Sequence, residues 1–160
     1  MFEQYREDIK RYRCDEGRKY DIPRFFHFAF RMRQTSKSIW ARGIWTILTR
    51  IALFGKASYI PRFVCGGGIV FPHLSGIIIS YNVVIGRNCT IYQQVTIGQD
   101  RLNTPGSAPY IGNNVLIGAG AKIIGPVHVG NNVRIGANTV VTKDIPDNCT
   151  VVGANRIISR

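Results

Sequence analysis

Hydrophobic positions in the C-terminal half of the chain recur every six residues. The residues in step are all Ile or Val, and most of them are followed directly by Gly. They are Ile79, Ile85, Ile91, Ile97, Ile111, Ile117, Ile123, Val129, Ile135 and Val141. Neither the helix period of 3.6 nor the strand alternation of 2 produces this spacing. A period of six indicates a hexapeptide repeat, whose short strands stack into a parallel β-helix.

A second series of small or β-branched residues lies four positions after the first. Its members are Val83, Cys89, Val95, Val115, Ala121, Val127, Val133, Thr139 and Ile145. Because Cys89 occupies one of these positions, we expect it to be a buried thiol. The corners of such a coil need unusual backbone conformations, which Gly and Asn tolerate best. The asparagines expected at corners are Asn88, Asn113, Asn114, Asn131, Asn132 and Asn138.

The first 57 residues have a different pattern, which predicts helices. Helix-forming and charged residues fill 2–13, four phenylalanines cluster within 25–30, and apolar residues form a helical stripe within 36–55. Ser36 or Ser38 could cap the last helix, and Gly55 could end it. We expect the stripe to pack on neighbouring helices or on a second subunit.

Three segments follow from these patterns. Residues 1–57 form a helical region, 58–148 a β-helix of about four turns, and 149–160 a C-terminal cap. Between Ile97 and Ile111 the spacing rises to fourteen, so a polar loop at 99–109 must leave the coil. Loops on a rigid scaffold often carry function. The fold class is all-β, with an N-terminal α-helical segment.

The net charge of +12 is concentrated near the N-terminus, where residues 1–62 carry 14 Lys/Arg against 6 Asp/Glu. Such a segment is typical of contact with an anionic membrane face, a polyanion or nucleic acid, and equally of a solvated helix face. The N-terminus lacks the apolar core of a signal peptide, and no stretch has the length of a membrane span. We therefore expect a cytoplasmic protein with possible peripheral contact at the inner membrane face. The four dispersed cysteines indicate neither a disulfide framework nor a zinc site.

Of the three histidines, His73 is the candidate for chemistry. It stands six residues before Ile79, where the repeat predicts an aliphatic residue. Breaks in a consistent pattern are where functional sites tend to lie, and imidazole can accept a proton near neutral pH. His27 lies among aromatic residues and His128 within a regular hexapeptide, so a structural role is favoured for both.

The segments GGGIVFPHLSGIIISYNVVIGRNCTIYQQVTIG and IGNNVLIGAGAKIIGPVHVGNNVRIGANTVV resemble the serine acetyltransferase group of hexapeptide acyltransferases, from about Ser58 to Val141. The VTIG and IGAGAKIIG motifs are widespread among these enzymes, whereas PHLSG placed before VTIG is more discriminating. The resemblance implies a left-handed parallel β-helix, an exception to the usual right-handed crossover. It also implies a homotrimer with active sites between subunits, acetyl-CoA as co-substrate without a metal, and His73 as the general base.

Several family residues are replaced in this chain. Ser58 stands where the family has an Asp that orients the base, and serine lacks the charge that would stabilise an imidazolium. Pro72 replaces an acidic residue that helps to bind the amino group of serine. Ser107 and Ala108 replace an Arg-His pair that binds the carboxylate, a contact that Arg101 could supply. We therefore expect a saccharide acceptor, as in the similar capsule and colanic-acid O-acetyltransferases, with free serine as the alternative.

The resemblance also assigns the coenzyme contacts. Ala119 and Ala137 correspond to coil positions whose backbone lies along the pantetheine arm, where small residues allow close approach. Gly98 and Gln99 begin the loop near the thioester. Lys143, Arg156 and Arg160 are the basic residues placed to meet the phosphates of the coenzyme, although solvated basic side chains are common at a C-terminus.

Three other functions remain open. A zinc enzyme on this fold needs a pair of nearby histidines, and intervals of 46 and 55 residues separate His27, His73 and His128. A non-catalytic hexapeptide-repeat protein is possible because the orienting Asp is absent. Nucleic-acid binding has only the charge in its favour, since the aromatic residues follow a packing pattern, and we expect none.

Overall fold

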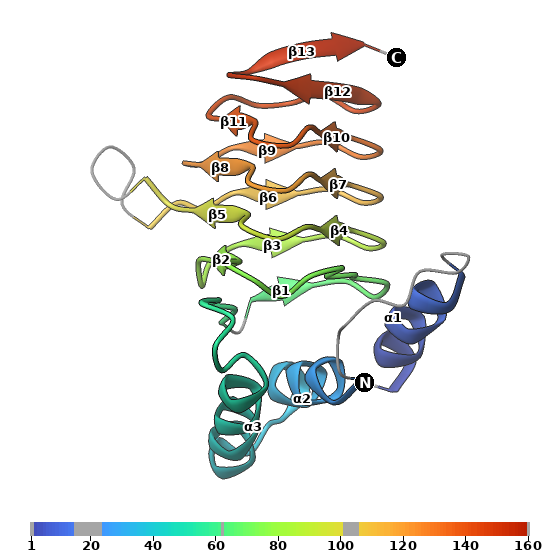
Figure 1. Cartoon of the computed structure of the whole chain (residues 1–160), viewed down its shortest axis with the longest axis vertical. Helices are drawn as coiled ribbons and strands as arrows, with labels where there is room; N and C mark the ends of the chain where they lie inside the picture. Colours follow the sequence, from blue (N-terminus) through green and yellow to red (C-terminus); the bar gives the residue numbers. More distant parts are fainter. Residues whose placement is uncertain (1, 15–23, 62, 101–105, 160) are drawn as a thin grey trace.

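The computed structural model describes residues 2–14, 24–61, 63–100 and 106–159. Three helices come first: α1 (Phe2–Cys14), α2 (Arg24–Thr35) and α3 (Ile39–Ala52). Short strands follow, stacked in coils above the helices (Figure 1). The strands are β1 (Val64–Cys65), β2 (Ile78–Ile79), β3 (Val84–Ile85), β4 (Thr90–Ile91), β5 (Thr96–Gly98), β6 (Tyr110–Ile111), β7 (Leu116–Ile117), β8 (Lys122–Ile124), β9 (His128–Val129), β10 (Arg134–Ile135), β11 (Val140–Val141), β12 (Cys149–Val152) and β13 (Arg156–Ser159).

The strands form a three-sided parallel β-helix, as the repeat predicts. Face 1 has the order β1-β3-β6-β9, face 2 the order β4-β7-β10-β12-β13, and face 3 the order β2-β5-β8-β11. Partners in regular coils are 18 residues apart, as for Tyr110 with His128 and Leu116 with Arg134. Eighteen residues are three hexapeptides, so each repeat supplies one side of a coil.

The residues in the six-residue step form the core of the coil. Each of the ten is at most 1% exposed, and every member of the second series is at most 3% exposed. The thiol of Cys89 is among them, as expected, and burial raises its pKa to about 11. The stacked apolar side chains therefore fill the interior continuously from coil to coil.

Asparagines occupy the corners in two different ways. Asn88, Asn114, Asn132 and Asn138 adopt left-handed backbone conformations, with φ between 54° and 57°. Asn113 and Asn131 do not; the Asn113 Nδ2 donates to Asn131 Oδ1 at 3.0 Å. A second side-chain ladder joins the left-handed asparagines, with Asn114 Nδ2 donating to Asn132 Oδ1 at 3.1 Å. The sequence thus identified the corner positions correctly, but only four of the six asparagines adopt the left-handed backbone conformation that was expected there.

The regular step is interrupted in the loop after β5, in the first coil, and near the C-terminal end, where Arg134 pairs with Thr150 at an offset of only 16. Val84 pairs with Tyr110, an offset of 26 that leaves eight additional residues in the loop between β5 and β6. The second interruption lies in the first coil, where Val70 pairs with Thr90 and Ile78 with Thr96. Eight positions therefore separate Val70 from Ile78 where six separate their partners. These two extra residues form a bulge that contains His73.

A buried ion pair joins the first two helices to the coil. The Nε and Nη2 atoms of Arg31 donate to the two carboxylate oxygens of Asp8 at 2.7 and 2.8 Å, and both side chains are buried. Asp8 also accepts a hydrogen bond from the backbone N–H of Ile69, while Arg31 donates to the carbonyl of Gly66. This pair fixes α1 and α2 against the base of the β-helix.

Helix α3 packs on α2 through its opposite side, and its apolar stripe faces solvent. Ile39, Ile44, Ile47 and Ile51 are each at least 58% exposed. The expected packing of this stripe on neighbouring helices is therefore wrong within the single chain. Ser38 stands at the N-cap, but its side chain makes no capping hydrogen bond. Among the described residues, no helix has the length and apolar character needed to cross a membrane.

The C-terminal residues fold back over the last coil. β12 continues face 2 by pairing with β10, and β13 then pairs with β12 in the antiparallel sense. All four residues of β13 are exposed. This hairpin ends the coil opposite the helices (Figure 1).

Candidate functional site

His73 lies on the bulge between Val70 on face 2 and β2 on face 3, and its side chain is exposed. Counted through the strand pairing, the core positions of this coil belong to Phe71 and Ile77, which are both fully buried. His73 therefore does not replace an inward aliphatic residue, and that part of the sequence interpretation is wrong. The two extra residues shift the count and place the imidazole on the outer surface, accessible to a substrate.

Ser58 fixes the bulge from the preceding turn of chain. Its hydroxyl donates a hydrogen bond to the Leu74 carbonyl at 2.7 Å and accepts one from the Ile77 N–H at 3.0 Å. A serine hydroxyl has one proton to donate, and the Leu74 carbonyl is its nearer acceptor, with the Lys56 carbonyl at 3.1 Å. Ser58 therefore contacts the backbone on the C-terminal side of His73.

Pro72, directly before His73, is buried. Its ring is consequently turned away from the surface on which the imidazole lies. A direct contact between this side chain and an acceptor, as predicted from the sequence, does not agree with that position. The ring instead holds the N-terminal side of the bulge, because proline fixes its own φ angle.

His73 begins a column of residues along the edge between faces 2 and 3, here called the His73 edge. His73, Gln93, Ala119 and Ala137 each follow a paired face 2 residue by three positions. Backbone hydrogen bonds stack the upper members directly, from Gly120 N to Gln93 O at 2.9 Å and from Asn138 N to Ala119 O at 2.8 Å. In the first coil the equivalent bond runs from Gln94 N to Ser75 O at 2.8 Å, so Ser75 lies below Gln93 and His73 precedes it by two residues on the bulge. The structure therefore brings the predicted base and the two predicted coenzyme-binding alanines onto one edge.

Gln93 is a residue that sequence reasoning missed. It lies one coil above the bulge, and its side-chain Oε1 is buried without a hydrogen-bond partner among the described residues. A buried amide oxygen without a donor is uncommon and is available to a ligand that brings one. The signal in the sequence was a Gln at a position where the next two coils have Ala, at 119 and 137.

Two glycines near the site differ in whether the packing of the coils requires a residue without a side chain. A Cβ added to Gly118 would lie 2.6 Å from the Ala137 backbone nitrogen, so stacking of the coils alone requires glycine there. A Cβ added to Gly98 would meet only side-chain atoms, at 3.6 Å or more. An alanine at position 98 would therefore fit without a steric clash. If the protein requires glycine there, the reason would be a ligand and not the packing of the coils.

The other predicted residues lie along a second edge, between faces 3 and 1, here called the loop edge. Gly98 ends β5 and Gln99 starts the loop, while Ser107 is exposed near its end. Lys143 is exposed higher on this edge, next to Thr142, whose N–H donates a hydrogen bond to Asn155 Oδ1 at 2.7 Å. Arg156 is also exposed, but it begins β13 on face 2, where it pairs with Val152. The predictions for Arg101 and Arg160 lie outside the described residues.

Face 3 separates the two edges. The extended chain from Gln94 to Gly98 covers about 13 Å, at roughly 3.3 Å per residue. Within one chain, His73 and the start of the loop therefore do not meet. In the described part of the chain, no cluster of three or more His, Cys, Asp or Glu residues could hold a metal ion.

The other two histidines are away from these edges. His27 is buried beside Asp8, with 3.7 Å between its Nδ1 and a carboxylate oxygen, and burial lowers its pKa. His128 is exposed on face 1 and stacks on Tyr110, with ring centroids 4.7 Å apart. His27 contacts Phe71, two residues before His73, with ring centroids 5.9 Å apart, but it is buried. The exposed His73 is therefore the histidine of the candidate site.

Comparison with known proteins agrees with this geometry. Residues 108–143 match the family Bacterial transferase hexapeptide (six repeats). Over 96 residues, the chain is 45% identical to a serine acetyltransferase of Synechococcus elongatus; the match covers 59% of this chain and 39% of the relative. The solved serine acetyltransferase of Brucella abortus superposes with a TM-score of 0.85 at 28% identity, covering 99% of this chain and 69% of that one. The chain thus spans well under two thirds of the curated relative's length.

These similarities support the hexapeptide acyltransferase group for this chain and imply the left-handed form of the coil. They contradict the expected saccharide acceptor, because the matching relatives are named serine acetyltransferase. The predicted resemblance to capsule and colanic-acid enzymes likewise gains no support. The replacements at Ser58, Pro72, Ser107 and Ala108 were thus the wrong basis for rejecting serine.

Proposed function

We propose that the chain is an acetyl-CoA-dependent serine O-acetyltransferase with His73 as its general base. The observation that carries this proposal is the exposed imidazole on a fixed bulge, at the foot of an edge whose upper coils have the small residues Ala119 and Ala137. The names of the relatives add the donor and the acceptor: one solved serine acetyltransferase is a complex with CoA, and the soybean enzyme is complexed with serine.

The reaction needs a base at the acceptor hydroxyl. A neutral hydroxyl is a weak nucleophile until a positioned group removes its proton. His73 accepts that proton while the serine oxygen forms a bond to the thioester carbon. The carbon–sulfur bond then breaks, and the imidazolium returns the proton to the sulfur of the departing CoA.

The two edges divide the remaining roles. Ala119 and Ala137 offer backbone groups without bulky side chains, which suits the pantetheine arm. Gly98 and Gln99 would lie near the thioester, and Lys143 and Arg156 are cations placed for the phosphates of the coenzyme. Arg101 and Ser107 remain our candidates for contact with the serine carboxylate.

Assembly explains how the two edges could serve one site. Because face 3 separates them in a single chain, a complete site needs the His73 edge of one subunit beside the loop edge of another. We therefore propose a homotrimer with three shared sites. Co-expression of His73→Ala chains with Gly98→Leu chains should restore activity that neither variant has alone, whereas sites within single chains would give no recovery.

The function is tested by identifying the product. The protein is incubated with acetyl-CoA and serine, and the acetylated product is analysed by mass spectrometry, with threonine and glucose as other acceptors. We expect O-acetylserine to form with release of free CoA. Acetyl transfer to none of these acceptors would remove the proposal in favour of a non-catalytic hexapeptide-repeat protein.

A further inference from the structure

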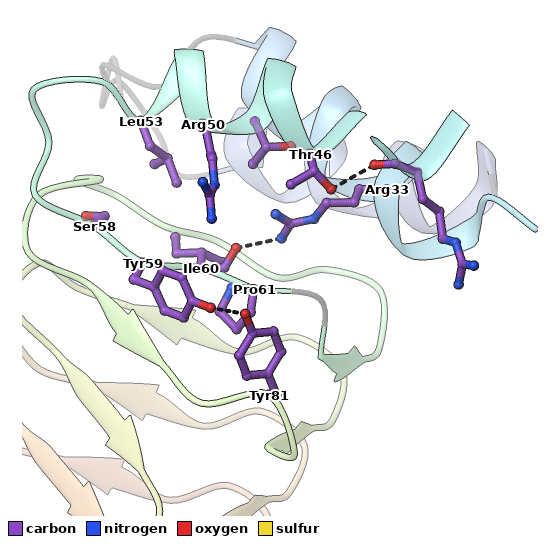
Figure 2. Close-up of a pocket in the computed structure, with 11 residues that line it drawn as sticks. Arg33, Thr46, Arg50, Leu53, Ser58, Tyr59, Ile60, Pro61 and Tyr81 are labelled. Carbon is purple, nitrogen blue, oxygen red and sulfur yellow. Dashed lines mark hydrogen bonds between the residues drawn. The ribbon is translucent and has the colours of Figure 1, made fainter. Parts of the chain in front are cut away.

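A pocket of about 390 Å³ lies between the helices and the base of the β-helix (Figure 2). Helices α2 and α3 supply one wall, and the chain entering the coil supplies the other. The lining residues are Arg33, Arg42, Thr46, Thr49, Arg50, Leu53, Ser58, Tyr59, Ile60, Pro61 and Tyr81. A volume in this range is typical of sites for small molecules.

The pocket is strongly basic. Arg33, Arg42 and Arg50 all line it, and the lining contains no acidic residue. Within the residues that the structure describes, none of these three guanidinium groups forms an ion pair. Arg42 and Arg50 lie two turns apart on α3, which places both on the same side of the helix. Three cations that share one hollow repel each other unless an anion lies among them.

Arg33 is the most unusual of the three because it is only 6% exposed. Its Nη2 donates to the Ile60 carbonyl at 2.6 Å, but its Nε is buried without a partner among the described residues. Burial lowers the pKa of this side chain to about 10, so it still carries its charge at neutral pH. An unpaired buried charge is costly, and a bound anion would relieve that cost.

Two tyrosines complete the wall opposite the arginines. The hydroxyls of Tyr59 and Tyr81 are hydrogen-bonded to each other, with ring centroids 5.9 Å apart. This hydrogen bond, together with partial burial, raises the pKa of Tyr59, so Tyr59 stays protonated at neutral pH. One of the two hydroxyl groups donates its proton to the hydrogen bond between the tyrosines. The other hydroxyl can donate its proton to a ligand in the pocket. Figure 2 shows both rings below Arg33 and Arg50.

The number of donors favours a phosphoryl group over a carboxylate. Three guanidinium groups and a tyrosine hydroxyl exceed what the two oxygens of a carboxylate can accept. A phosphate monoester offers three terminal oxygens and up to two negative charges, and arginine binds such groups through two parallel hydrogen bonds. Leu53, Ile60 and Pro61 add apolar surface that suits the organic part of such a ligand.

We propose that this pocket binds a small organic phosphate monoester, with its phosphoryl group among Arg33, Arg42 and Arg50 and its organic part against Leu53, Ile60 and the tyrosine rings. The proposal does not rest on acetyl transfer. Of the lining residues, Ser58 also contacts the His73 bulge, so the pocket and the proposed active site are neighbours through one side chain.

Calorimetric titration with phenyl phosphate tests the site, with benzoate as the carboxylate analogue. We expect phenyl phosphate to bind at least tenfold more tightly than benzoate. Arg50→Gln should weaken its binding at least tenfold, and Arg42→Gln should act in the same direction. Both positions lie on the surface of α3, and thermal unfolding monitored by circular dichroism verifies that each variant is folded. Arg134→Gln removes the same charge from β10 and should change the affinity less than twofold.

Three results would overturn the proposal. The first is no binding of phenyl phosphate, and the second is binding that Arg50→Gln leaves unchanged. The third is a loss of binding in Arg156→Gln in place of Arg50→Gln, which would assign the phosphate to the C-terminal end of the coil, where β13 lies. Each of these readouts is independent of acetyl transfer, so failure of the proposed enzymatic function would leave this test intact.

Discussion

The Ser58 hydroxyl donates a hydrogen bond to the Leu74 carbonyl, one residue after His73, at 2.7 Å. Together with the bond that Ser58 accepts from the Ile77 N–H, it closes the bulge that carries the imidazole. The candidate base is therefore held through its backbone, by a residue that lies fifteen positions earlier in the chain.

Replacement of Ser58 by Ala should loosen this bulge. The change leaves the Leu74 carbonyl and the Ile77 N–H without their partner, which costs about 1–3 kcal/mol where these groups are buried. We expect urea unfolding to show a decrease of that size in the free energy of unfolding, with a lower kcat. Ser75→Ala, on the same bulge but exposed, is the matched control and should change stability by less than about 0.5 kcal/mol. Equal effects of the two changes would contradict the role of Ser58.

Gly98→Ala separates a requirement of the fold from a requirement of the ligand. Because an added Cβ meets side-chain atoms at 3.6 Å or more, the variant should fold with nearly unchanged stability. If the coenzyme lies against this glycine, KM for acetyl-CoA should rise roughly tenfold, which corresponds to about 1.4 kcal/mol. Gly118→Ala should behave differently and destabilise the coil by about 1–3 kcal/mol, because its Cβ meets backbone at 2.6 Å. An unchanged KM in a folded Gly98→Ala protein would remove Gly98 from the coenzyme site.

His27 should make the protein less stable in mild acid. Burial lowers its pKa in the folded state from the ordinary value of 6.5. Below about pH 6.5 this imidazole is protonated in the unfolded chain but stays neutral in the folded chain. The free energy of unfolding therefore falls as the pH decreases. One such group contributes at most about 1.4 kcal/mol per pH unit.

The measurement is the free energy of unfolding between pH 7.5 and 5, for the native protein and for His27→Gln. Asp8 and Arg31, which face His27, are kept in both proteins. We expect a smaller loss of stability on acidification in the variant, whereas His128→Gln at an exposed position should keep the native slope. A native slope in His27→Gln would show that other groups cause the acid sensitivity.

The sequence predicted the coil well because its signal is local and repeated. Each Ile or Val of the six-residue step points inward for the same reason, so one residue such as Ile117 supports the assignment of the next. The bulge was misjudged because the same counting was continued from Ile79 back to His73, across two extra residues. Only the pairing of Val70 with Thr90 and of Ile78 with Thr96 reveals that shift.

The site residues were harder to predict because they depend on contacts between distant segments. The hydrogen bond from Ser58 to Leu74 and the pairing of Asp8 with Arg31 leave no periodic trace in the sequence. The basic pocket has the same character: Arg42 and Arg50 share a helix side, but Tyr59 and Tyr81 join them only through the register of the coil. The prediction of a saccharide acceptor was wrong because replaced residues such as Ser107 were taken as evidence of another substrate.

The central claim is that His73 removes the proton from the serine hydroxyl. The most direct test is the rate of serine-dependent CoA release from acetyl-CoA by the native protein, His73→Ala and the control His128→Ala. General base catalysis contributes about 10²- to 10⁴-fold, so we predict a loss of at least about 100-fold for His73→Ala and a rate within about threefold of native for His128→Ala. Equal serine-dependent rates for the native protein and a folded His73→Ala variant would contradict the claim.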